Sequence, residues 1–319
     1  MAKSKLFNAL FKEGTLALNL LQEIAPHHAN GAVLLELNGY RDLDDIPWEY
    51  AWSGRGYLVC ERMFTYMLEG EERQLPKLPL CIVIVAPDPM GSDKLGLANL
   101  HLSDQFLNFI NEFYNSSKMV ILERVLPATI NKMNSLLAEK NNEVATVLHF
   151  MGHCTMTDDD SRALVFEHSK HGKPDIVKMP CLISTLENLW LAFLSACNTR
   201  EIARDIAQQG VQYTIGSYCS LPDDIARDFE AQFYRNLAQG QSVDKAMWKT
   251  RMELVESADS EDFWQRNYLV GALILYSNMP QMANSLFLCK SGNPIIKLNK
   301  YPNNLETIST MQTFFRLHG

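Results

Sequence analysis

The feature that most constrains the fold is a regular alternation, from about residue 80 onward, of short apolar runs with amphipathic helical patterns. The runs are rich in Val, Ile, Leu and Phe and are bounded by turn residues, as buried strands are. Strands that alternate with helices build a mostly parallel sheet covered by helices, so we expect an α/β fold. The expected strands are 80–86, 119–125, 144–150, 189–196, 211–216 and 269–276.

Helical periodicity falls between these runs. Apolar residues recur at helical spacing in 106–113, 126–137, 202–207 and 225–237, and a further helix is expected to begin at Ser242. Gly210 and Gly240 follow two of these patterns, as glycine commonly does after a helix C-terminus.

The chain outside this alternation is less regular, and we expect three parts. Residues 1–79, with a helical pattern at 10–24, a strand-like 32–37 and an aromatic cluster at 48–52, predict a smaller N-terminal α+β subdomain. The main α/β domain is expected over 80–277. The polar segment 278–319 is interpreted as a C-terminal extension or linker.

Composition restricts the cellular compartment and the classes of partner that we expect for this chain. A net charge of −8 without a block of Lys or Arg argues against a surface that tracks phosphates, so no direct nucleic-acid binding is expected. Seven cysteines are an odd number, and several lie in apolar runs, as free thiols do in a reducing compartment. The N-terminus lacks a leader pattern and no apolar run approaches ~18 residues, so a cytoplasmic protein without a membrane span is expected.

Two reactive side chains follow expected strands. His153 comes after 144–150, and Cys197 ends 189–196. Because the carboxyl ends of neighbouring parallel strands meet at one edge of a sheet, these side chains are expected to come within reach of each other. A thiol needs a base or a lowered pKa to attack a carbonyl, and both His153 and the helix that follows Cys197 are suited to provide this activation. From the residues alone, Cys197 as a buried apolar group and His153 as a hydrogen-bonded surface residue remain alternatives.

Several motifs together resemble a known family. Residues 148–154 (LHFMGHC) and 192–199 (AFLSACNT) resemble the two apolar blocks that precede the catalytic His and Cys of caspase-type peptidases. Residues 46–52 (IPWEYAW), 124–137 (RVLPATINKMNSLL) and 215–247 resemble further elements of the CHAT domain, a caspase- and separase-like family. These elements follow the family order over roughly residues 35–276.

The resemblance implies a caspase-like, mostly parallel six-stranded sheet sandwiched by helices. It implies a cysteine endopeptidase without cofactor or metal, in which Cys197 is the nucleophile, His153 the acid/base partner, and the backbone N–H groups of Cys154 and Cys197 the oxyanion hole. The family usually has Gly directly after the catalytic His, where this chain has Cys154. This departure leaves open an altered substrate preference, a reduced activity or an inactive pseudo-protease that acts as a protein-interaction module.

His149 and a metal site are alternatives to this assignment. His149 lies four residues before His153 and is expected to pack against or orient the site. Together with Cys154 these histidines suggest a zinc site, but the β-rich run before them predicts a strand, and the chain has no Cys-x-x-Cys pair. No metal is therefore expected.

The family's primary pocket suggests where substrate selectivity is encoded. An acidic residue there would pair with a basic substrate side chain, although a solvated surface acid is an equal alternative. The candidates are Asp88, Asp158, Asp159, Asp160, Ser195, Ser217 and Tyr218.

The expected partners also follow from the resemblance. Relatives of this kind are effectors in prokaryotic defence or signalling, bound or fused to a regulatory sensor, and they act on a protein substrate. A nucleotide-binding α/β domain is disfavoured, because no Gly-x-Gly-x-x-Gly or Gly-Lys-Ser/Thr loop follows a strand.

Overall fold

A computed structural model describes the main sheet and most of the helices that cover it. The described residues are 5–15, 18–19, 22, 32–36, 46–68, 77–90, 120–140, 144–181, 186, 189–220, 222–239, 241–257, 269–278 and 295–298. None of the described helices is both long enough and apolar enough to cross a membrane.

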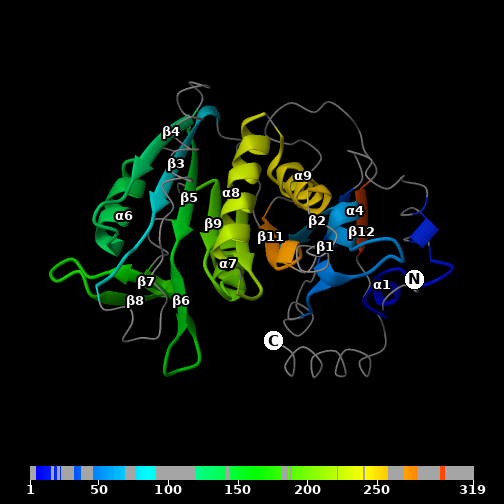
Figure 1. Cartoon of the computed structure of the whole chain (residues 1–319), viewed down its shortest axis with the longest axis horizontal. Coiled ribbons are helices and arrows are strands. Elements are labelled where there is room, and N and C mark those ends of the chain that lie inside the picture. Colours follow the sequence, from blue (N-terminus) through cyan, green and yellow to red (C-terminus); the bar gives the residue numbers. More distant parts are fainter. Residues whose placement is uncertain are drawn as a thin grey trace.

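The strands of the main sheet are short and mostly buried. They are β1 (Ala32–Glu36), β2 (Met63–Met67), β3 (Lys77–Val85), β4 (Val120–Arg124), β5 (Val144–Met151), β9 (Leu191–Ser195), β10 (Tyr213–Ser217), β11 (Leu273–Ser277) and β12 (Ile295–Leu298). Their order is β12-β1-β2-β11-β10-β9-β5-β3-β4 (Figure 1). Within this sheet only the β10–β11 pair is antiparallel among the described pairings.

The expected fold class is confirmed, with a wider sheet than expected. The six expected strands form β3, β4, β5, β9, β10 and β11. The expected number of six strands is too small. Strand β2 pairs with β11, β1 pairs with β2, and β12 pairs with β1, which adds three strands to the sheet. The division at 79/80 and 277/278 stays a prediction, although strands from all three expected parts share this sheet.

The helices lie on both faces of the sheet. They are α1 (Lys5–Leu10), α4 (Leu58–Glu61), α6 (Ile130–Ala138), α7 (Arg200–Gln208), α8 (Asp223–Ala238) and α9 (Val243–Glu256), with 3₁₀ turns at Trp48–Tyr50 and Met179–Cys181. Ile215 pairs in register with Phe193, whose ring contacts Phe233 of α8. Thr214, which points the opposite way, donates a hydrogen bond to the carbonyl of Ala203 in α7. Helices α7 and α8 therefore cover opposite faces of the sheet.

Apolar side chains between these layers form the core. Phe150, Phe193 and Phe233 are among its fully buried members, and β3 is buried along Leu80–Val85. Such continuous apolar strands are typical of a parallel sheet covered on both faces. The expected helix at 106–113 lies outside the described residues, as does most of 16–31.

A small antiparallel sheet follows β5 and was not expected from the sequence. It consists of β6 (His153–Met156), β7 (Arg162–Glu167) and β8 (Pro174–Lys178), in that order. Leu164 and Val177 on one face join the main core, while Ile176 on the other face is exposed. Figure 1 shows this sheet beside the end of β5.

Candidate active site

The ends of β5 and β9 lie side by side. These strands are parallel neighbours, with Met151 opposite Ser195, and the N–H of Gly152 donates to the carbonyl of Ser195 over 3.1 Å. His153 lies two residues beyond Met151, and Cys197 lies two residues beyond Ser195. The structure thus brings the segments that carry both side chains to the same edge of the sheet, from which the β6–β7 hairpin extends in Figure 1.

Cys197 begins a sharp turn between β9 and α7. Cys197 is half-buried. The next residue, Asn198, has a backbone φ of 55°. Asparagine is one of the few residues that adopts this left-handed conformation at low cost. Thr199 then occupies the N-cap of α7, so the positive end of the helix lies a few residues after the thiol.

Thr199 holds this turn against the neighbouring strand. Its buried hydroxyl accepts a hydrogen bond of 3.0 Å from the N–H of Ser217 at the end of β10. The same hydroxyl lies 3.2 Å from the carbonyl of Leu194 and 3.1 Å from that of Ala196, either of which accepts its proton. Thr199 therefore anchors the turn that contains Cys197 to both β9 and β10.

His153 and Cys154 are the first residues of β6, opposite Val165 and Leu164 of β7. Successive strand residues point to opposite faces, so the two side chains diverge. The thiol of Cys154 donates to the carbonyl of Asn198 over 3.9 Å, beneath the turn that carries Cys197. Burial raises the pKa of the Cys154 thiol to about 11, so this cysteine is protonated at neutral pH.

His149 belongs to a buried polar network between β5, β9 and α8. Its Nδ1 lies 2.9 Å from the hydroxyl of Tyr234, and its Nε2 lies 3.5 Å from Oε2 of Glu230. The hydroxyl of Ser195 donates to Oε1 of the same carboxylate. Burial, reinforced by the Glu230 carboxylate, holds the pKa of Tyr234 well above its usual range, so the phenol keeps its proton. Ser195 therefore contacts α8 beneath the edge that carries Cys197.

Asp88 lies at the end of the strand on the other side of β5. It is exposed, and its backbone N–H donates to Oε1 of Glu167 over 3.0 Å. The second oxygen of Glu167 accepts from the N–H of Ala128 over 3.2 Å, which ties the loops after β3 and β4 to β7. The Glu167 carboxylate thus fixes the backbone at Asp88 while leaving its side chain in solvent.

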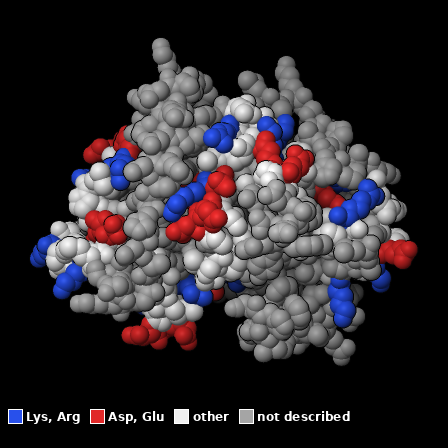
Figure 2. Space-filling view, in the orientation of Figure 1, with Lys and Arg blue, Asp and Glu red and all other residues white. Residues whose placement is uncertain are grey.

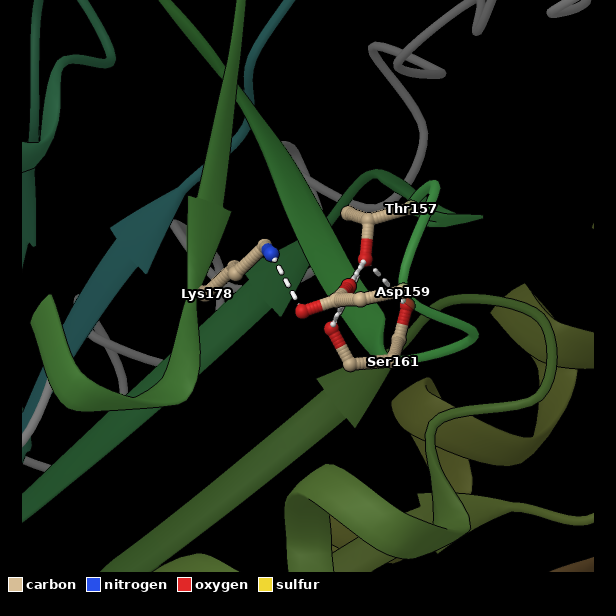
Figure 3. A network of polar contacts seen from close by, with 4 residues as sticks. All are labelled: Thr157, Asp159, Ser161 and Lys178. Carbon is tan, nitrogen blue, oxygen red and sulfur yellow. Dashed lines mark hydrogen bonds and ion pairs between the residues drawn. The ribbon is translucent and has the colours of Figure 1, made fainter.

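The acidic residues 158–160 form the exposed tip of the β6–β7 hairpin, beyond the end of β6, as Figure 2 shows at the lower edge of the molecule. Asp159 accepts hydrogen bonds from Thr157 and Ser161 and forms a 2.8 Å ion pair with Lys178 of β8 (Figure 3). These hydrogen bonds hold the pKa of the Asp159 carboxyl well below its usual range, and the bond from Lys178 has the largest effect. Asp159 therefore stabilises the hairpin turn.

The remaining pocket candidates follow β9 and β10. Ser217 is buried and its hydroxyl donates to the carbonyl of Cys219. Tyr218 is half-buried, and Arg200 of α7 donates to its hydroxyl over 3.0 Å and lies 4.6 Å above its ring centroid. Asp88, Ser195 and Ser217 accordingly lie at the ends of β3, β9 and β10, on either side of the end of β5.

The described thiols and histidines do not assemble into a metal centre. Within the described part of the chain, no three His, Cys, Asp or Glu residues are grouped so that they could hold a metal ion. The six cysteines in this part, which exclude Cys289, are free thiols.

Several residues that shape this edge were not found from the sequence. Glu230 and Tyr234 adjoin the expected apolar stripe of α8, and a carboxylate beside two phenylalanines was the available signal. Thr199, Glu167 and the left-handed Asn198 had no comparable signal, because their roles depend on contacts between separate elements.

Comparisons with known proteins identify one matching family model. The sequence model of the CHAT domain matches residues 4–276. No curated protein matches the chain. Two of the solved structures that are similar to this chain are gingipain structures. A complex of Porphyromonas gingivalis RgpB pro- and mature domains is 10% identical with a TM-score of 0.47, covering 82% of this chain and 67% of that one. The Arg specific cysteine proteinase gingipain R is 8% identical with a TM-score of 0.41, covering 79% and 78%.

Proposed function

Because this chain belongs to the CHAT domain family, we propose that it is a cysteine endopeptidase that cleaves a protein partner through a dyad of Cys197 and His153. The observation that carries the proposal is the adjacency of β5 and β9, with the Gly152 N–H bonded to the Ser195 carbonyl immediately before both residues. A half-buried thiol in a sharp turn before a helix is the arrangement that nucleophilic catalysis requires.

The reaction proceeds in two halves. His153 takes the thiol proton, and the sulfur of Cys197 forms a bond to the scissile carbonyl carbon, whose oxygen becomes an oxyanion. The backbone N–H groups of Cys154 and Cys197 donate to this oxygen, and one such donor typically contributes about 10²–10³ in rate. The C–N bond then breaks as His153 returns the proton to the amine. Water activated by His153 hydrolyses the thioester, which releases the carboxylate and restores the thiol.

Selectivity is assigned to the loops around this edge. Asp88 after β3 is the better placed acid, because its side chain is exposed and its backbone is fixed by Glu167. Ser195 and Tyr218, which are half-buried, contribute the walls beside Cys197, and the buried Ser217 supports them through its hydrogen bond to the carbonyl of Cys219. The acidic tip 158–160 is a more distant candidate, since it lies beyond the end of β6.

The biological setting of the family supports a further part of the proposal. The protein acts as an effector in prokaryotic defence or signalling and is controlled by a sensor protein or domain. Co-purification of a partner that changes the cleavage rate would support this assignment, and full activity of the isolated chain would count against it.

A pseudo-protease that binds its partner without cleaving it is the second candidate. The observation that favours it is Cys154, a β-strand residue with a half-buried thiol at the position where the family usually has Gly. A folded chain that retains a partner but produces no new termini would support this alternative.

The deciding experiment compares newly formed protein termini in cells that express the wild type, Cys197→Ala or His153→Ala. Cys219→Ala is the matched control, since it removes another half-buried thiol that follows the adjacent strand β10. We expect a set of termini in the wild type and in Cys219→Ala that disappears in both dyad variants. Identical termini in wild type and Cys197→Ala would refute the peptidase.

A further inference from the structure

A buried carboxylate connects the two strands that lead to the proposed dyad. Glu230 and His149 are 1% and 0% exposed, and Tyr234 is 1% exposed. One carboxylate oxygen of Glu230 accepts from Ser195, two residues before Cys197. The other faces Nε2 of His149, four residues before His153. Both contacts lie on the face of the sheet that α8 covers.

The contacts of this network favour one tautomer of His149. A proton on Nε2 lets the ring and the Glu230 carboxylate attract each other across the 3.5 Å that separates Nε2 from Oε2. His149 Nδ1 is then an acceptor, and it receives the phenolic proton of Tyr234 over 2.9 Å. In this tautomer, Glu230 and Tyr234, which lie one helical turn apart on α8, orient the imidazole from both of its nitrogens.

Such a network is not needed for packing. Phe193, Phe229 and Phe233 already fill the space between β9 and α8. Replacing buried charged groups by apolar residues of similar volume is often neutral or stabilising, because desolvation offsets their attraction. A carboxylate makes contacts of defined geometry, which apolar side chains do not. The two oxygens of Glu230 thereby specify where β9 and β5 lie relative to each other and to α8.

We propose that Glu230 is a positioning residue, whose carboxylate, shared between Ser195 and His149, sets the ends of β9 and β5 and with them the separation of the Cys197 thiol from the His153 imidazole. This inference rests on the proposed dyad. His149 transmits the position of Glu230 to β5, and Tyr234 keeps the His149 ring oriented. Glu230, His149 and Tyr234 do not touch the substrate.

The test measures the rate at which iodoacetamide alkylates Cys197, as a function of pH and by peptide mass spectrometry. Glu230→Leu keeps most of the volume but removes both polar contacts. We expect it to slow alkylation of Cys197 at neutral pH about tenfold or more and to move its pH profile toward that of His153→Ala. Thermal stability should be retained or increased.

Glu230→Gln is the conservative variant, because its amide can accept from His149 and donate to the Ser195 hydroxyl. It should restore the alkylation rate to within about threefold of the wild type. Tyr234→Phe, which removes a single hydroxyl, should also slow alkylation of Cys197. It provides the test of the positioning role if Glu230→Leu does not fold. Its matched control is Tyr66→Phe, which also removes a buried hydroxyl bonded to a carboxylate, but in β2, separated from β9 by two strands.

The outcomes separate the positioning role from the dyad itself. If the wild type shows a fast, His153-dependent reaction that Glu230→Leu and Tyr234→Phe leave unchanged, the positioning role is wrong and the dyad stands. An equal loss in Glu230→Leu and Glu230→Gln would also overturn it. If His153→Ala does not alter the wild-type profile, the dyad fails and this inference fails with it.

Discussion

The buried hydroxyl of Thr199 accepts a 3.0 Å hydrogen bond from the N–H of Ser217, which joins the turn after Cys197 to the end of β10. Thr199→Val keeps the shape of the side chain and removes this acceptor. An unsatisfied buried N–H costs about 1–3 kcal/mol, so we expect the free energy of unfolding to fall by that amount. Because the bond also fixes the turn, alkylation of Cys197 should slow.

Thr199→Ser is the control for this prediction, since it retains the hydroxyl and loses only a methyl group. Urea unfolding followed by fluorescence gives the free energies, and the alkylation rate is measured in the same samples. Equal stability of Thr199→Val and the wild type would show that the Ser217 N–H finds another acceptor.

The α/β class and the buried strands that lead to His153 and Cys197 were predictable from local patterns. Apolar runs such as β5 and β9 are typical of buried parallel strands, and the parallel pairing of these two strands places their carboxyl ends together. The small sheet β6–β8 was not predicted, because its strands are short and only 163–166 of β7 forms a continuous apolar run. The contact of Glu230 with Ser195 joins residues 35 positions apart, which no local pattern encodes.

The cysteines should differ strongly in reactivity. Burial raises the pKa of Cys60 to about 12 and those of Cys81 and Cys154 to about 11. At pH 7.5 a thiol with a pKa near 11 is ionised in roughly one molecule in three thousand, and the thiolate is the nucleophile. We expect iodoacetamide to modify Cys197 before these three.

Peptide mass spectrometry of the native protein over time checks this order. His153→Ala should reduce the rate at Cys197 and leave the rates at Cys60, Cys81 and Cys154 unchanged. Modification of Cys154 ahead of Cys197 would contradict the assignment of the nucleophile.

Asp88 should determine any preference for a basic substrate residue. Its side chain is exposed beside the end of β5, whereas Asp159 is engaged by Lys178 at the hairpin tip. A hydrogen bond between charged groups contributes about 1.5–3 kcal/mol, which corresponds to roughly tenfold or more in binding. We therefore expect Asp88→Asn to lower kcat/KM at least tenfold for peptides with Arg or Lys at the cleavage position.

Asp159→Asn is the matched control, because it removes the same charge while leaving the neutral turn contacts to Thr157 and Ser161 available. Its kcat/KM on basic peptides should stay near the wild-type value. A peptide library in which the wild type cleaves after acidic or purely apolar residues would exclude a role for either acid in selectivity.

Glu49 should make the stability of the protein depend on pH. Burial raises the pKa of its carboxyl to about 7, despite opposing effects from a backbone hydrogen bond, from Arg251 and from Tyr66. Below pH ~4 the carboxyl is protonated in both states. As pH rises to 7, the unfolded chain loses this proton first, so the contribution of the protonated Glu49 to stability disappears. Its size is about 3 kcal/mol, at about 1.4 kcal/mol per pKa unit.

Glu49→Gln removes this titration and keeps an oxygen that accepts from the hydroxyl of Tyr66, which lies 2.9 Å from the wild-type carboxylate. Relative to Glu49→Gln, the wild type should therefore lose about 3 kcal/mol of unfolding free energy between pH 4.5 and 7.5. Urea titrations of both proteins across this range measure the difference. Glu256→Gln, at the exposed end of α9, controls for the change of net charge. Parallel stability profiles for wild type and Glu49→Gln would show that Arg251 compensates the buried carboxylate in full, and that Glu49 is ionised in the folded protein well below neutral pH.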